Sequence, residues 1–230
     1  MLNIIEYICI LVANLTPQIM ALDLVDILKI APAAVIGLTV HEFSHAYAAY
    51  KLGDSTAKEE GRLTLNPLKH IDWLGFFLII IAGFGWAKPV SFNPNNLKNK
   101  HRDEIIISVA GPISNFILAI LFFVIARILY STSYFKTSGL EIINLIMTWG
   151  IINFSLFVFN LIPIPPLDGS HIYLTYLKEI NPKLMTNMYK WGTLGLILII
   201  VAENKLGINI LHISDLVGGL SKFFISLMSF

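Results

Sequence analysis

A run of five residues, His41-Glu-Phe-Ser-His45, carries the side chains best suited to metal chemistry in this sequence. If the run is helical, His41 and His45 lie on one face, and both imidazoles can point at a single ion. Glu42 is rotated by one position and can approach a water on that ion without being a ligand. Zinc lowers the pKa of such a water to about 7, and a carboxylate can take its proton as it attacks a carbonyl. The pattern predicts one catalytic zinc ion with Glu42 as the general base.

A third protein ligand is expected, because a catalytic zinc usually has three and keeps a fourth position for water. His70 and His101 lie in polar segments, where we expect them to be solvated rather than ligating. Asp168 is the better candidate, since it follows a proline-rich break in the apolar segment Asn160–Gly169. A broken helix at membrane depth is tolerated mainly where it lines a cavity, so a ligand from a second helix can enter there.

The two parts of this predicted site lie at similar depths. His45 precedes Lys51 by six residues, which is about 9 Å of helix. Asp168 precedes Lys178 by ten residues, which is about 15 Å if that part is helical. We therefore expect Asp168 to meet the two histidines close to one membrane face.

The composition indicates that a lipid bilayer surrounds most of the chain. Of the 230 residues, 56% are hydrophobic and only 13% are charged, and the mean hydropathy is +0.72. Soluble domains average about 25% charged residues. The net charge is +1 and no Lys/Arg run is present, so nucleic acid is not an expected partner. Cys9 is the only cysteine, which excludes an internal disulfide and a thiolate zinc cluster.

Apolar segments predict an all-α polytopic membrane protein with about five to six transmembrane helices, each needing about 20 residues. Residues 1–23 are expected to form an apolar or interfacial segment. Residues 24–230 are expected to form a single integral-membrane domain, with its metal core at about 35–172. The candidate spans are Ile27–Tyr50, Glu104–Tyr130, Leu140–Ile162 and Met188–Ala202, and the weaker ones are Leu2–Met20 and Ile208–Phe230.

A different structure is expected between the first metal-bearing helix and the next span. Trp73–Trp86 is only 14 residues long and contains three glycines, which suits a re-entrant or interfacial hairpin. On either side, Gly61–Pro67 and Lys88–Pro94 alternate polar and apolar residues and then stop at Asn-Pro. These patterns predict short β-strands near Leu63–Leu65 and Val90–Phe92. One hypothesis is that these strands and the hairpin present an extended substrate beside the zinc. The alternative is a membrane-anchoring hairpin that makes no contact with substrate.

Charge asymmetry predicts how the spans are oriented. Basic residues are frequent in Lys51–Arg102 and in Lys178–Lys190, whereas Ser131–Gly139 contains only Lys136. By the positive-inside rule, the first two regions face the cytoplasm. The expected location is the cell membrane, as a multi-pass protein with its metal site near the cytoplasmic side.

These motifs together resemble the site-2 protease family of intramembrane zinc metalloproteases, in its compact prokaryotic branch without PDZ or CBS domains. The resemblance rests on the two metal motifs and on further matches at Gly61–Pro67, Gly85–Val90, Ala110–Asn115 and Asn160–Pro166. It implies that His41, His45 and Asp168 are the zinc ligands and that Glu42 is the base.

The same resemblance implies that Asn115 and Asn160 line the site and bind the substrate backbone or polarise its carbonyl. Structural roles stay open for both residues. Asn115 can form a hydrogen bond between helices beside Gly111, and Asn160 can cap the broken backbone before Pro163. The implied substrates are transmembrane proteins or peptides, while the oligomeric state stays open.

Two other interpretations use the same ligands. A membrane metal transporter would need a polar path through the whole bilayer and often has repeat symmetry. This sequence has one polar cluster near one face and no visible repeat. A non-proteolytic metal-binding membrane protein is the second alternative, although it would not need Glu42. Replacing Glu42 by Gln separates these interpretations, because only peptide hydrolysis requires the base.

Overall fold

The computed structural model describes residues 24–72, 88–132 and 139–206, together with 210–212, 215–219, 223 and 226. These residues form helices, and no β-strand occurs among them. The long helices are α2 (Leu24–Lys51), α5 (Lys100–Tyr130), α7 (Leu140–Asn160) and α9 (Pro182–Leu206). The short ones are α3 (Thr56–Glu59), α8 (His171–Ile180) and the 3-10 turns η1 (Pro67–Lys69), η2 (Pro94–Asn96) and η3 (Asp168–Ser170).

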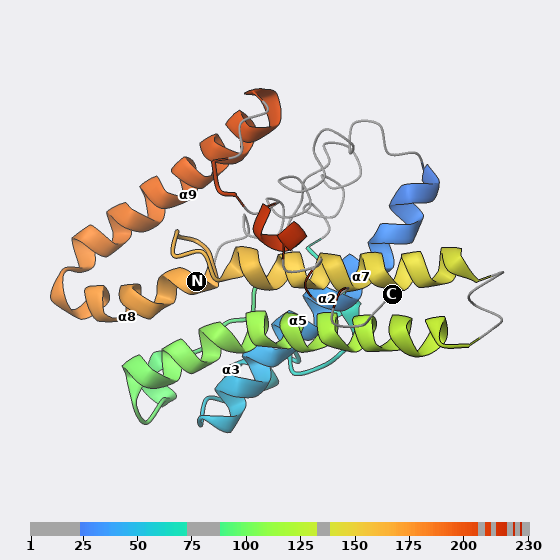
Figure 1. The fold of residues 1–230 in the computed structure, drawn as a ribbon. Coiled ribbons are helices and arrows are strands. Elements are labelled where there is room, and N and C mark those ends of the chain that lie inside the picture. Colours follow the sequence, from blue (N-terminus) through green and yellow to red (C-terminus); the bar gives the residue numbers. More distant parts are fainter. Residues whose placement is uncertain are drawn as a thin grey trace.

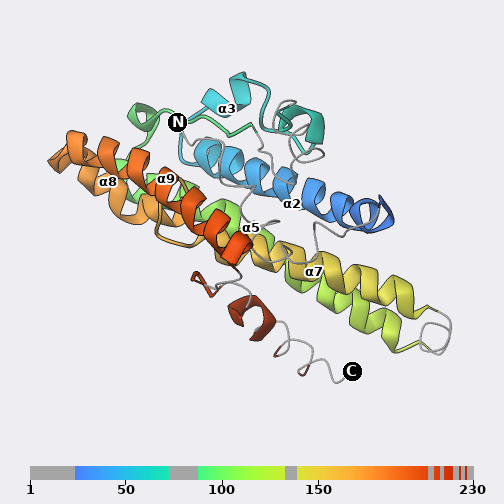
Figure 2. The ribbon, with the colours of Figure 1, turned by 90° about the horizontal axis from the view of Figure 1, so that it is seen from above.

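Three of the long helices form the core of the bundle. α5 and α7 run side by side, and α2 packs against both (Figure 1). Their shared interior is apolar and includes Phe123, Phe154 and Phe159, which are at most 1% exposed. Seen from above, α2 lies between this pair and the connecting segments that carry α3 and η1 (Figure 2). The metal motif on α2 is therefore enclosed from two sides.

Two helices of the described chain, α5 and α7, are long and apolar enough to cross a membrane. They correspond to the predicted spans Glu104–Tyr130 and Leu140–Ile162. α2 extends over 28 residues and matches the predicted Ile27–Tyr50. The sequence predicted five to six spans, and the described residues support two of them. Residues 1–23 and most of Ile208–Phe230 lie outside the described residues.

The helix predicted at Met188–Ala202 is longer than expected and begins at Pro182 as α9. Asn181 precedes it, and its side-chain oxygen accepts a hydrogen bond from the Leu184 N–H at 3.0 Å. Asparagine followed by proline is a common helix start, because the side chain caps a free N–H and proline lacks one. The prediction from the length of the apolar run alone missed this helix start.

The short strands predicted near Leu63–Leu65 and Val90–Phe92 are wrong, because both stretches are irregular. The Val90 N–H, for example, donates to the Glu42 side chain rather than to a neighbouring strand. The Asn66 and Asn93 side chains accept from the N–H groups two residues later and start the turns η1 and η2. Pro89 also has no N–H to donate. The predicted hairpin at Trp73–Trp86 lies outside the described residues.

Asp54 ties the segment after α2 to the segment before α5. Its buried carboxylate accepts hydrogen bonds from the Asn93 N–H at 2.8 Å, the Asn96 amide at 2.7 Å and the Thr56 hydroxyl at 2.6 Å. Burial by itself raises the pKa of a carboxyl group, but the hydrogen bonds from Thr56, Asn93 and Asn96 hold the pKa of Asp54 below its ordinary value. The ionised form therefore stabilises this connection.

Acidification should weaken this connection. Because the pKa of Asp54 is lowered in the folded protein, its contribution is present above the unfolded pKa near about 4 and is lost at lower pH. Asp54→Asn should lower the melting temperature at pH 7, with a smaller difference from wild type at pH 3. The exposed Glu60→Gln is the control and should have little effect at either pH. A constant difference for Asp54→Asn would contradict this account.

The contact between α5 and α7 depends on Gly150, since a Cβ there would lie 2.5 Å from Cε1 of Phe123. Gly150→Ala should lower the free energy of unfolding by about 1–3 kcal/mol through overpacking. Gly195→Ala on α9 is the matched control, because a Cβ there meets no atom within 4 Å. It should raise stability by up to about 1 kcal/mol through helix propensity. Unfolding in detergent measures both, and equal effects would contradict the packing argument.

Candidate metal centre

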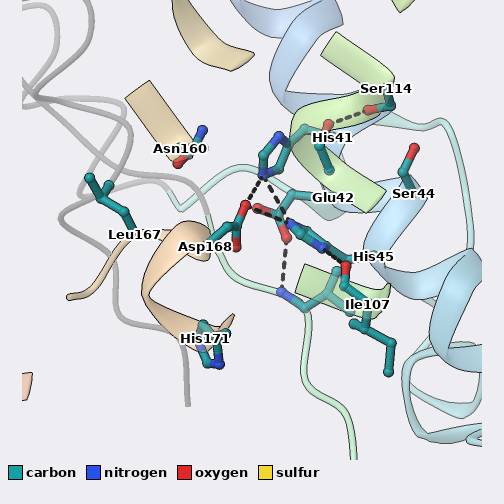
Figure 3. A network of polar contacts seen from close by, with 12 residues as sticks. His41, Glu42, Ser44, His45, Ile107, Ser114, Asn160, Leu167, Asp168 and His171 are labelled. Carbon is teal, nitrogen blue, oxygen red and sulfur yellow. Dashed lines mark hydrogen bonds and ion pairs between the residues drawn. The ribbon is translucent and has the colours of Figure 1, made fainter. Parts of the chain in front are cut away.

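Side chains from two distant parts of the chain converge inside the bundle. α2 supplies His41 and His45, and Asp168 begins the turn η3 after α7 (Figure 3). The two Nε2 atoms are 2.9 Å apart, and they lie 3.1 Å and 3.3 Å from the Asp168 Oδ2 atom. Ligands about 2.0–2.1 Å from a tetrahedral zinc are separated by about 3.3 Å. The three atoms are therefore spaced as one small ion requires.

The outer nitrogen of each imidazole faces an oxygen. His41 Nδ1 lies 2.6 Å from Oδ1 of Asn115, and His45 Nδ1 lies 2.7 Å from the Ile107 carbonyl. Both oxygens are acceptors, so each Nδ1 carries the proton and donates it. Each Nε2 then presents a lone pair toward the other ring and toward Asp168. Partners of this kind are typical behind metal-binding histidines, because they fix ring direction and tautomer.

The donor set fits a zinc ion. His41, His45 and Asp168 are 1%, 5% and 1% exposed, and among the described residues they form a cluster whose ligand atoms could hold a metal ion. No hydrogen-bond donor reaches either carboxylate oxygen of Asp168 in the described chain. Two lone pairs and a carboxylate that face one another in the interior favour a cation between them. Two imidazoles with one carboxylate suit zinc, whereas calcium and magnesium prefer oxygen ligands alone.

The break that follows α7 delivers Asp168 to this position. α7 ends at Asn160, and Leu167 before the aspartate is fully buried, which anchors the turn. Gly169 packs directly against the chain that it has just left, because a Cβ there would collide with the Leu161 carbonyl group. A larger residue would push η3 away from α2. The proline-rich break predicted from the sequence thus carries the carboxylate into the bundle.

α5 forms the third wall of the site with residues spaced one turn apart. The carbonyl of Ile107 faces His45 and the amide of Asn115 faces His41. Between them lies Gly111, where a Cβ would be 2.6 Å from His41 Nε2 and closer still to His45 Nε2. Any larger residue would fill the space in front of the lone pairs. Sequence reasoning missed Ile107, because a backbone carbonyl leaves no signal in residue type.

Glu42 lies beside the cluster and is 3% exposed. Its Oε2 atom accepts a hydrogen bond from the Val90 N–H at 3.0 Å. This contact connects α2 to the segment that follows the undescribed residues 73–87. Sequence reasoning did not identify the Val90 N–H either, for the same reason as Ile107.

The two asparagines have different surroundings, although both are fully buried. Asn115 accepts from His41 and donates to the Gly37 carbonyl at 3.0 Å and to Asn153 Oδ1 at 3.2 Å. Asn160 donates to the Leu156 carbonyl at 3.1 Å, and its Oδ1 lacks a hydrogen-bond partner among the described residues. Asn115 therefore holds the ring of His41, while Asn160 keeps an acceptor near the cluster (Figure 3).

The other histidines considered in the sequence lie outside the cluster. His70 is 2% exposed, so the expectation that it is solvated is wrong. Its Nε2 donates to the Thr64 carbonyl at 2.8 Å, and burial lowers its pKa. His101 is partly exposed, stacks on Tyr176 with ring centres 4.5 Å apart, and lies 3.2 Å from Glu179.

Comparison with known proteins gives a consistent result. Peptidase family M50 matches residues 30–139 and 132–202. YwhC of Bacillus subtilis is 45% identical over 143 residues, which are 60% of this chain and 64% of that protein. Rip2 of Mycolicibacterium smegmatis is 30% identical over 173 residues, or 73% and 64%. MJ0611 of Methanocaldococcus jannaschii is 31% identical over 165 residues, or 71% and 72%.

All three relatives are provisionally named zinc metalloproteases. The matches span just under two thirds of the length of YwhC and of Rip2. No solved structure matches the chain. The family match covers well over half of the chain and includes the cluster of His41, His45 and Asp168. The chain therefore belongs to peptidase family M50, the site-2 protease family that its motifs resemble.

Proposed function

We propose that this chain is a zinc metalloendopeptidase that hydrolyses peptide bonds within or next to transmembrane segments of membrane proteins. The observation that carries the proposal is the buried convergence of two Nε2 atoms and a carboxylate oxygen within 3.3 Å of one another. In this proposal His41, His45 and Asp168 hold one zinc ion, and Glu42 is the general base. The family and the names of the relatives support the same chemistry.

Zinc, when bound, supplies a Lewis acid that acidifies a water and polarises the scissile carbonyl. Glu42 accepts the proton of the attacking water on its carboxylate and passes it to the nitrogen of the leaving chain. The hydrogen bond from the Val90 N–H fixes the orientation of that carboxylate. Burial keeps bulk water away, so each of these electrostatic contacts acts in a medium of low dielectric.

A membrane location is supported by the two long apolar helices α5 and α7, of which α5 forms a wall of the site. α5 contributes Ile107, Gly111 and Asn115 to the wall of the cluster and is itself long enough to span. The chemistry would thus take place beside a transmembrane helix, which favours membrane-spanning proteins or peptides as substrates. We propose a multi-pass arrangement in the cell membrane, with the metal near the cytoplasmic face. The basic residues of Lys51–Arg102 support that orientation.

Removing the base should abolish hydrolysis without removing the metal. Glu42→Gln in detergent-purified protein should cut a model transmembrane substrate at least about 1,000-fold more slowly, because the proton has no acceptor. Zinc measured by mass spectrometry should stay near one ion per chain. A chelator should also stop wild-type cleavage, and added zinc should restore it. Normal cleavage by Glu42→Gln would rule out the proposed base.

Asn115 separates a role in holding the metal site from a role in binding substrate. Asn115→Ala removes the acceptor behind His41 and should weaken zinc binding by about 10–100-fold, as loss of such partners does elsewhere. At saturating zinc the KM for substrate should be unchanged. Ser114→Ala is the matched control, since that hydroxyl donates to the Gly111 carbonyl of its own helix. An unchanged zinc affinity with a raised KM would instead assign Asn115 to the substrate.

A further inference from the structure

Arg62 is a buried arginine in the irregular segment that follows α3, and it is 4% exposed. Its guanidinium donates to three backbone carbonyls. Nη1 lies 2.5 Å from the Lys69 oxygen, and Nη2 contacts the oxygens of Lys88 and Pro89, the latter at 3.0 Å. The side chain thereby joins the segment before residue 73 to the segment after residue 87.

The third of these carbonyls belongs to a peptide group with a second function. The C=O of Pro89 and the N–H of Val90 are opposite ends of one planar peptide unit. Its oxygen accepts from Arg62 at 3.0 Å, and its N–H donates to Oε2 of Glu42 at 3.0 Å. A positive charge, a peptide dipole and a carboxylate are therefore arranged in sequence. The guanidinium polarises the unit and strengthens the hydrogen bond that its N–H gives to Glu42.

The charge of Arg62 has no close carboxylate partner among the described residues, since no ion pair to it is found there. Burial lowers the pKa of Arg62, while the more distant charges of Glu42 and Glu60 oppose that change. Burying a cation in such a site is unfavourable unless its charge is paired or hydrogen-bonded. The peptide unit at Pro89–Val90 gives it an indirect contact with Glu42.

The geometry points to Arg62 as a positioning residue for the base: it holds the Pro89–Val90 peptide so that its N–H fixes the Glu42 carboxylate. This inference rests on the proposed role of Glu42 in hydrolysis. A purely structural cross-link between the two segments would also use the guanidinium. In that structural account, the effect of Arg62 on catalysis would not depend on the Val90 N–H. The two accounts therefore predict different experimental results.

The first experiment changes the guanidinium. Arg62→Lys keeps the positive charge but cannot reach three carbonyls at once, because an ammonium lacks the planar fork. It should lower kcat for a model transmembrane substrate by about 10–100-fold, in line with loss of a hydrogen bond to a charged group. KM and zinc content should stay within about twofold of wild type, because neither substrate nor metal ligands are touched. Arg102→Lys, an exposed arginine, is the matched control and should retain full activity.

The second experiment removes only the N–H. Replacing the amide of Val90 by an ester, with the corresponding α-hydroxy acid in place of valine, keeps the side chain and the Pro89 carbonyl. The ester should lower kcat by a similar factor, and combining it with Arg62→Lys should lower kcat no further. Residues that act through one contact are non-additive in such a cycle. Effects that multiply, or a kcat unchanged by either single change, would overturn the inference.

A spectroscopic measurement separates this inference from the proposed function. In protein labelled with 15N-valine, the Val90 amide proton is assigned with Val90→Ile, and it should move upfield in Arg62→Lys and in Glu42→Gln. If the Val90 amide proton signal does not shift in Arg62→Lys, the proposed link from Arg62 to Glu42 is rejected, even if the wild type cleaves its substrate. Conversely, a wild type without peptidase activity but with the expected shifts would reject the proposed hydrolysis and leave the contact intact.

Discussion

Two imidazole lone pairs and one carboxylate face one another in the interior of this bundle, and that arrangement governs the rest of the structure. Each group alone would be unfavourable in a site that is at most 5% exposed. Together they can serve as ligands for one small cation, provided that their directions are fixed by the surrounding groups. The surrounding helices supply those directions. Much of the chain between Gly37 and Asp168 can be understood as support for three atoms within 3.3 Å of one another.

α5 gives the most economical example of this support. Ile107, Gly111 and Asn115 lie at successive turns of one helix face. The first and third orient the two rings through their Nδ1 atoms, and the second keeps the space in front of the Nε2 atoms open. The site is thus supported by the backbone carbonyl of Ile107, the missing side chain of Gly111 and the side-chain amide of Asn115. The apolar remainder of the helix packs against α7, so the same element serves the site and the core.

Periodicity and local motifs predicted the parts of the molecule that depend on short sequence windows. The spacing of His41 and His45 predicted that they share a helix face, and the break before Asp168 predicted a further ligand from a second part of the chain. The structure brings these three residues together. The long apolar helices α5 and α7 were equally visible, because each is a long apolar run in the sequence.

Features that depend on the partner of a backbone group could not be predicted in this way. The alternation around Leu63 and Val90 predicted strands, yet the Val90 N–H donates to the Glu42 side chain and the Thr64 carbonyl accepts from the His70 ring. His70 looked solvated because its neighbours are polar, but tertiary folding buries it. The carbonyl of Ile107 and the N–H of Val90 are present at every residue, so only three-dimensional structure distinguishes them.

The amide of Asn115 joins three helices, because it contacts His41 and Gly37 on α2 and Asn153 on α7 from its own position on α5. Under the proposed function, binding of an ion at this site and assembly of the bundle would therefore be thermodynamically linked. An ion that binds only the assembled arrangement lowers its free energy relative to separated helices, by an amount that grows with the logarithm of the ion concentration. Depleting the cation would loosen the contacts between α2, α5 and α7 as well as silence the chemistry.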